Sequence, residues 1–172
     1  MANPRVQIES WSTGHNRWQE LWSYICEHEP FPAEFVDNEA TNSYFASIAL
    51  APDDKLIGYH LLRVQPIGPE MDMPEIKDQN DNVLQEAKVR ALRVDESWRN
   101  QGIGTRLQEA TLAKAAELGC FQMRSRSSLD RVENYAIKIK LGFACHPANR
   151  TFKDGTVEAG VYWVKRMNQD EA

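Results

Sequence analysis

The sequence has 172 residues, of which 42% are hydrophobic and 26% are charged, and its formal net charge at pH 7 is −5. This length and composition predict one soluble globular domain, residues 1–172, with a single core. The negative charge argues against a general affinity for nucleic acid or for an anionic membrane surface, and it suits a cationic partner.

The three cysteines, Cys26, Cys120 and Cys145, are an odd number without CxxC spacing. This pattern argues against a disulfide framework and against a structural zinc site, so we expect no metal and a reducing compartment. The N-terminal segment lacks the apolar run of a signal peptide, and no stretch reaches membrane-spanning length. We therefore predict a cytoplasmic protein that does not bind a membrane.

The first half of the chain predicts a helix flanked by strands. Residues Val6–Trp11 alternate as in a short strand, and Asn16–Glu29 carries an apolar helical stripe. Prolines 30 and 32 end that helix, and a second short helix is expected over 33–42. Tyr44–Ala51 and Lys55–Ile67 then read as an antiparallel hairpin. The polar stretch 68–82 that follows is expected to be a loop and suggests no chemistry.

The middle of the chain predicts a β-α-β unit. Val83–Val94 reads as a strand whose polar residues fall on both faces, and Gly102–Leu118 reads as a helix ended by Gly119. Phe121–Ser127 returns as a strand directly afterwards. The two strands of this unit should be parallel.

The last third predicts one more helix and a final hairpin. Asp130 and Glu133 fit a capping box for that helix, and Gly142 would end it. Its expected buried face consists of Val132, Tyr135, Ala136 and Ile139. Residues 143–152 and 157–167 should then pair as an antiparallel hairpin.

The loop Arg99-Asn100-Gln101-Gly102-Ile103-Gly104 stands between the strand and the helix of the β-α-β unit. Two glycines let the backbone approach a bound group, and the free amides of the helix N-terminus favour an anion. A dinucleotide fingerprint would need a glycine where Leu107 stands, and no Walker Gly-Lys-Ser/Thr run exists. Two interpretations of the loop remain, a phosphate-binding site of another type and a tight turn that binds no ligand.

The pattern Arg99-x-x-Gly102-x-Gly104 resembles the acyl-CoA loop of the GNAT N-acetyltransferase superfamily. The preceding LRVDESW resembles the lead-in to that loop, and Leu141-Gly142-Phe143 resembles the Leu-Gly-Phe signature of the family's last helix. The resemblance implies an α/β (α+β) acyl-CoA N-acyltransferase fold. Its sheet would be mixed and mostly antiparallel, with helices on both faces.

The resemblance also implies a donor site for acetyl-CoA. Backbone N–H groups would hold its diphosphate, Arg99 would border it, and the strand backbone would bond the pantetheine arm near the splayed fourth and fifth strands. A backbone N–H near Val94 would polarise the thioester carbonyl. The cofactor-binding residues implied in this way are Leu92, Val94, Arg99, Asn100, Gln101, Gly102, Ile103, Gly104 and Thr105.

The chain departs from the family at two catalytic positions. Many members have a tyrosine acid where Lys138 stands, and many have a glutamate on the fourth strand where Arg90 stands. Tyr135, one turn before Lys138, and His146, after the Leu-Gly-Phe signature, are the substitutes for proton transfer. A core role for Tyr135 is the competing interpretation.

The resemblance implies acetyl transfer from acetyl-CoA to a primary amine. A carboxylate-rich stretch would favour a cationic acceptor such as a polyamine, an aminoglycoside or a lysine side chain; it contains Glu27, Glu29, Glu34, Asp37 and Glu39. A catalytically silent acyl-CoA sensor or assembly module remains the alternative, and O-acyl transfer or a longer acyl chain stays open. By family analogy, a homodimer through the terminal hairpin stays open as well.

Overall fold

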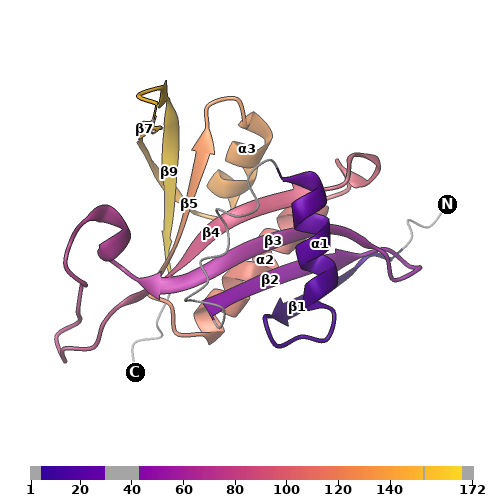
Figure 1. Ribbon diagram of the computed structural model, residues 1–172, viewed down its shortest axis with the longest axis horizontal. Coiled ribbons are helices and arrows are strands. Elements are labelled where there is room, and N and C mark those ends of the chain that lie inside the picture. Colours follow the sequence, from indigo (N-terminus) through magenta and orange to yellow (C-terminus); the bar gives the residue numbers. More distant parts are fainter. Residues whose placement is uncertain (1–4, 30–42, 153, 168–172) are drawn as a thin grey trace. The chain divides into compact units, whose positions relative to one another are not determined.

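The computed structural model describes residues 5–29, 43–152 and 154–167 (Figure 1). The helix predicted over 33–42 lies outside these residues. The described strands form a mixed seven-stranded sheet of order β1-β2-β3-β4-β5-β9-β6, and β7 pairs separately with β8. The chain divides into two compact units, residues 1–64 with 90–114 and residues 65–89 with 115–172, which are described in turn.

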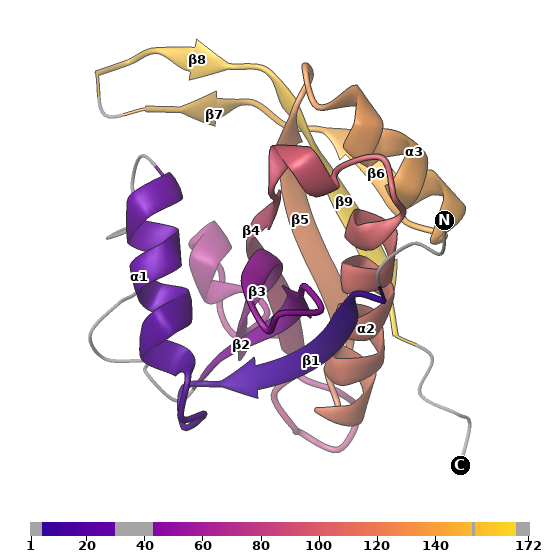
Figure 2. The same ribbon diagram turned by 90° about the vertical axis from the view of Figure 1, so that its right-hand side faces the viewer.

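The first unit begins with three antiparallel strands. They are β1 (Gln7–Ser12), β2 (Tyr44–Leu50) and β3 (Leu56–Pro66), whose last two residues belong to the second unit. Helix α1 (Trp18–His28) lies on one face of these strands, and α2 (Ile103–Glu117) begins on the other face (Figure 2). The predicted first strand, first helix and hairpin are therefore confirmed.

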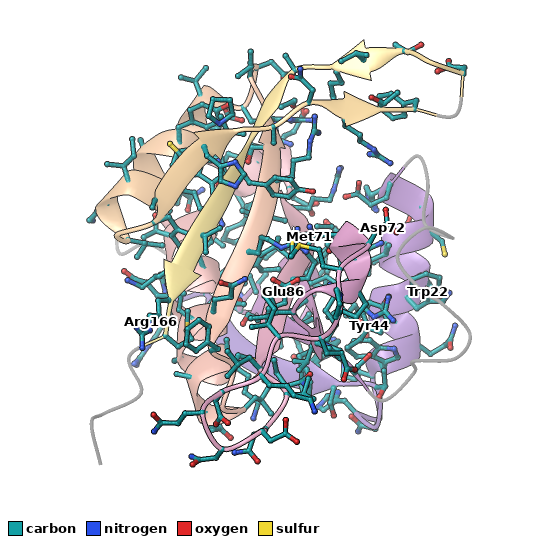
Figure 3. All side chains as sticks on the ribbon, turned by 90° about the vertical axis from the view of Figure 1, so that its left-hand side faces the viewer. Trp22, Tyr44, Met71, Asp72, Glu86 and Arg166 are labelled. Carbon is teal, nitrogen blue, oxygen red and sulfur yellow. The ribbon has the colours of Figure 1, made fainter. Side chains whose placement is uncertain are left out.

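Each face of these strands has its own apolar core. Leu21 and Ile25 of α1 are buried against Tyr44 of β2, with Trp18 and Trp22 packed at the margin (Figure 3 labels Trp22 and Tyr44). The helical stripe expected from the spacing is thus the buried side of α1. The other core lies between these strands and α2, and it includes Ile103, the first residue of that helix.

The second unit is built on β4 (Gln85–Val94), whose first five residues belong to it, and on β5 (Gln122–Ser128). These strands are parallel, as the β-α-β pattern predicted, over three residue pairs that end at Lys88 and Arg124. Two antiparallel neighbours follow, β9 (Gly160–Arg166) beside β5 and β6 (Ala144–Pro147) beside β9. The predicted terminal hairpin is confirmed in outline. Its outer part is the short pair β7 (Arg150–Thr151) and β8 (Val157–Glu158).

Helix α3 (Val132–Lys140) exists as predicted, but three of the four residues of its predicted buried face are exposed. Val132 and Ile139 are each 66% exposed, and Ala136 is also exposed. Tyr135 is half-buried as predicted, and the unpredicted inward residue is Lys138, because each of the two side chains has an aromatic ring to pack against. Tyr135 packs edge-on against Trp163 with ring centroids 5.0 Å apart, and the Lys138 ammonium lies 4.3 Å from the centre of the Phe143 ring.

The capping box predicted for α3 is also wrong. The helix begins at Val132 with Arg131 at the N-cap position, and no side chain caps it. The Asp130 carboxylate accepts a hydrogen bond from the Ser128 hydroxyl instead. Gly142, at φ +76°, ends the helical segment as expected. The fold class itself is confirmed, since the sheet is mixed, mostly antiparallel, and has helices on both faces.

Candidate functional site

The loop between β4 and α2 begins with one turn of 3-10 helix, η4 (Glu96–Trp98). Two residues then take left-handed backbone conformations, Asn100 at φ 59° and Gly102 at φ 76°. They reverse the chain so that α2 starts at Ile103, and the Arg106 N–H donates to the Gly102 carbonyl at 3.1 Å. The amides just before Arg106 are the ones that helix geometry leaves without intrahelical acceptors.

The start of α2 is anchored by its apolar side. Ile103 and Leu107 are buried in one cluster with Ala49 and Ile57, and the β4 side chains Leu92 and Val94 pack against this cluster. The helix N-terminus is therefore held rigidly on the strands of the first unit. Its dipole and free amides give this point a partial positive charge.

The loop surface around Gly102 is open. A Cβ built on Gly102 would meet no atom within 4 Å, and the two residues that precede it, Asn100 and Gln101, are exposed. Free amides, open space and a helix N-terminus together fit a phosphate group. Arg99 borders the loop, where its Nε donates to the Val94 carbonyl at 3.0 Å and its Nη1 lies 3.7 Å from Glu96.

A close backbone contact holds the end of β4. A Cβ on Gly58 of β3 would lie 2.8 Å from the Arg93 carbonyl oxygen and 3.3 Å from the Val94 Cα. Only glycine permits this approach. The sequence reasoning missed Gly58, although a single glycine inside a strand pattern is a recognised signal of close backbone packing.

A buried charged network occupies the second unit, and one of its carboxylates, Glu70, comes from the stretch 68–82, where the sequence suggested no chemistry. Glu86 is fully buried and accepts hydrogen bonds from Arg124 at 2.7–3.2 Å. Glu70, from the 3-10 turn η3 (Pro69–Met71), pairs with Arg124 and with Lys88. Figure 3 labels Glu86 and also Met71, the last residue of η3. The sequence signal that could have indicated this network is the presence of polar residues on both faces of β4.

The ionisation of this network follows from its geometry. Burial raises the pKa of Glu70, but the charges of Lys88 and Arg124 outweigh it and leave the pKa below its ordinary value. Burial and the charge of Arg124 lower the pKa of Lys88. The Lys88 ammonium and the Arg124 guanidinium also lie over the Tyr162 ring, at 4.7 and 5.2 Å from its centre.

The two proton-transfer candidates, Tyr135 and His146, both lie in the second unit. The Tyr135 hydroxyl donates to the Ser128 carbonyl at 3.1 Å, and its ring packs on Trp163, so it has core contacts. His146 is exposed on β6, with Nδ1 3.1 Å from the Pro147 carbonyl and its ring 5.7 Å from Tyr162.

Lys138 is the unexpected residue of α3. Its side chain is 1% exposed, and its ammonium has no hydrogen-bond partner among the described residues. Burial lowers the pKa of Lys138 from 10.5 to about 7. The position that departs from the family's tyrosine therefore holds an amine that titrates near neutral pH.

The residues that the structure describes contain neither a cluster of metal ligands nor a membrane-spanning helix. No group of three or more His, Cys, Asp or Glu side chains in ranges 5–29, 43–152 and 154–167 is arranged to hold a metal ion. No helix in the same ranges combines the length and apolar character needed to cross a membrane. Of the carboxylates in the predicted acceptor stretch, only Glu27 and Glu29 are described, since Glu34, Asp37 and Glu39 lie outside these residues.

The family assignment rests on a match to the acetyltransferase (GNAT) family model over residues 10–138. This span covers most of the chain and includes the loop, α2 and most of α3. The chain belongs to the acetyltransferase (GNAT) family and is therefore an acyltransferase. No curated protein sequence matches the chain.

Solved structures agree with this assignment at the level of the fold. Arabidopsis thaliana NAA60 in complex with acetyl-CoA has a TM-score of 0.72 at 13% identity, covering 95% of this chain and 99% of its own. A GNAT family acetyltransferase from Elizabethkingia anophelis with acetyl-CoA bound has a TM-score of 0.57 at 14% identity, covering 94% and 97%. A chain of the NatC complex bound to Gag peptide and CoA has a TM-score of 0.66 at 13% identity, covering 95% and 99%.

Proposed function

We propose that this protein transfers an acetyl group from acetyl-CoA to a primary amine. The observation that carries the proposal is the open loop around Gly102 at the N-terminus of α2. The backbone amides from Gln101 to Thr105, including those of Ile103 and Gly104, would hold the diphosphate of coenzyme A. Asn100 shapes this loop through its left-handed backbone.

The rest of the donor site would lie on the exposed loop and on the end of β4. Arg99 would border the diphosphate, and the backbone of Leu92 and Val94 would bond the pantetheine arm. The Val94 carbonyl already accepts a hydrogen bond from Arg99, which ties the loop to the strand. The solved neighbours with acetyl-CoA bound support this choice of donor.

The acetyl thioester supplies the activated acyl group. The neutral amine nitrogen forms a bond to the acyl carbon as the carbon–sulfur bond breaks, the nitrogen then loses a proton, and the sulfur leaves as a thiolate that takes up a proton. We propose Tyr135 and His146 for the proton transfers. His146 is exposed on β6, whereas the Tyr135 hydroxyl must first break its hydrogen bond to the Ser128 carbonyl.

For the acceptor we propose an amine of a small molecule or of a peptide. The NatC structure with a bound Gag peptide and CoA supports a peptide amine. The carboxylates Glu27 and Glu29 support a cationic acceptor, although Glu29 already accepts the Tyr59 hydroxyl. A cytoplasmic location and a homodimer belong to the same proposal, which includes neither a nucleic-acid partner nor a membrane.

Titration calorimetry with acetyl-CoA tests the donor site. We expect binding by the wild-type protein and loss of binding in Gly102→Trp and Gly104→Trp, because an indole would fill the space over the loop. Unchanged binding in both variants would contradict the site. A Lys114→Ala variant, in the same helix but away from its start, is the control and should bind normally.

Release of free thiol then separates an enzyme from a sensor. With acetyl-CoA present, a panel of polyamines, aminoglycosides and peptide amines should include at least one acceptor that releases thiol at a steady rate. Binding of acetyl-CoA without release on the whole panel would favour the sensor. The residues Arg90 and Lys138 are what favour this second reading, because many family members have a catalytic glutamate and tyrosine at these positions.

A further inference from the structure

Asp95 directly precedes η4 and the proposed donor loop, and hydrogen bonds hold its backbone. Its N–H donates to the Ile57 carbonyl of β3 at 2.9 Å, and its carbonyl accepts from the Trp98 N–H at 2.9 Å. Aspartate at this position commonly caps the following turn with its own carboxylate. No side chain caps η4 here. The Asp95 carboxylate instead accepts a hydrogen bond from the Tyr24 hydroxyl of α1, 71 residues earlier in the chain.

Tyr24 is itself held firmly. Its ring lies edge-on against Tyr59, with centroids 6.0 Å apart at 89°, and 4.2 Å from the ring of His28. Burial and the hydrogen bond to Asp95 raise the pKa of Tyr24, and the nearby Arg93 opposes them only in part. The hydroxyl therefore stays protonated and remains a donor to Asp95 at physiological pH.

We infer that Tyr24 is a positioning residue of the donor site, which holds Asp95 and thereby sets where the loop from Glu96 to Gly102 begins. This inference rests on the proposed function, because the loop needs a fixed position only if its amides meet a ligand. A displacement of the loop by a fraction of an ångström misaims the amides at the start of α2. Tyr24 acts through Asp95 and does not touch the donor itself.

Tyr59 supplies a matched control within the same cluster. It also donates its hydroxyl to a carboxylate, Glu29 Oε1, at 2.7 Å, and burial likewise raises its pKa. Glu29 is the C-cap residue of α1, whereas Asp95 stands at the start of the loop, directly before η4. Tyr24→Phe and Tyr59→Phe therefore delete the same group from adjacent rings with different consequences for the loop.

The test is acetyl-CoA binding by the wild-type protein and the two phenylalanine variants. Loss of a hydrogen bond to a charged group should raise the Kd about tenfold in Tyr24→Phe. The Kd should stay within about twofold of wild type in Tyr59→Phe, because the loop keeps its anchor. In turnover, Tyr24→Phe should raise the KM for acetyl-CoA and leave the KM for the amine unchanged. Equal weakening in both variants, or none in either, would overturn the inference.

Amide hydrogen exchange gives a second measurement that needs no ligand. The amides from Glu96 to Gly102 should exchange faster in Tyr24→Phe than in wild type, while Tyr59→Phe leaves them unchanged. Unchanged exchange in Tyr24→Phe would refute the anchor even if acetyl-CoA binds. If the wild-type protein does not bind acetyl-CoA, the proposed function fails, and the exchange result still decides whether Tyr24 holds the loop.

Discussion

Replacing the buried Lys138 by methionine should stabilise the protein. The side chain is 1% exposed and its ammonium has no hydrogen-bond partner among the described residues, so folding strips water from a charge and gives it only the face of the Phe143 ring in exchange. Methionine has nearly the same length and fills the same space without a charge. Its thioether would also lie well against the Phe143 ring.

The magnitude follows from the pKa of Lys138, which falls from 10.5 to about 7. This difference of about 3.5 units corresponds to about 5 kcal/mol, at about 1.4 kcal/mol per unit. Below pH 7 the folded and unfolded chains both carry the proton, so the whole cost is present. Above pH 7 the folded amine becomes neutral while the unfolded chain keeps its proton up to about pH 10.5, so the cost falls steadily with pH.

Urea unfolding at pH 6 and at pH 8.5 measures this effect. The free energy of unfolding of Lys138→Met should exceed that of wild type by about 5 kcal/mol at pH 6 and by about 3 kcal/mol at pH 8.5. Lys140→Met is the matched control, because Lys140 lies on the same helix but is exposed. Its difference from wild type should be small and equal at both pH values. A Lys138→Met difference that does not change with pH would refute the reasoning.

Three further predictions concern packing and the buried network, and urea unfolding measures each of them. Gly58→Ala should lower the free energy of unfolding by about 1–3 kcal/mol, because the new Cβ would lie 2.8 Å from a carbonyl oxygen. Gly14→Ala, with its nearest atom at 4.0 Å, should change it little; equal losses would contradict the argument. Glu86→Gln should cost about 3–5 kcal/mol, because it removes the fully buried one of the two carboxylates that balance the Arg124 charge, and a loss below 1 kcal/mol would contradict this. Ile139→Glu should change the free energy by no more than about 0.5 kcal/mol, whereas a large loss would mean that this face of α3 is buried after all.

Helix α3 shows where reasoning from the sequence stops. Apolar residues occur at several positions around this helix, so periodicity does not choose one face. Tyr135 and Lys138 face inward because Trp163 and Phe143 present aromatic surfaces to them, and both of those residues follow the helix in the chain. The lysine is the residue that a hydrophobic pattern assigns to solvent.

The long-range polar contacts were equally out of reach. Tyr24 meets Asp95 across 71 residues, and Glu70 meets Arg124 across 54. The local sequence around Asp95 or Glu70 does not predict which residue pairs with the carboxylate. Glu70 in particular stands in a stretch that reads as an ordinary polar loop, and only the pairing of β4 with β5 brings Arg124 within its reach.

The loop from Arg99 to Gly104 was readable from the sequence alone because its determinants are local. Backbone freedom at Gly102, the start of a helix and the strand before it all follow from neighbouring residues, and so does the resemblance to an acyl-CoA loop. The family match confirms the resemblance to the GNAT family, and the parallel pairing of β4 with β5 confirms the β-α-β unit, whereas the binding role of the loop residues stays a prediction. Tertiary structure alone decided which face of α3 is buried, that Lys138 loses its water, and that Tyr24 holds Asp95. These features depend on tertiary packing, which in the case of Tyr24 and Asp95 joins residues 71 apart, and local sequence patterns do not predict such contacts.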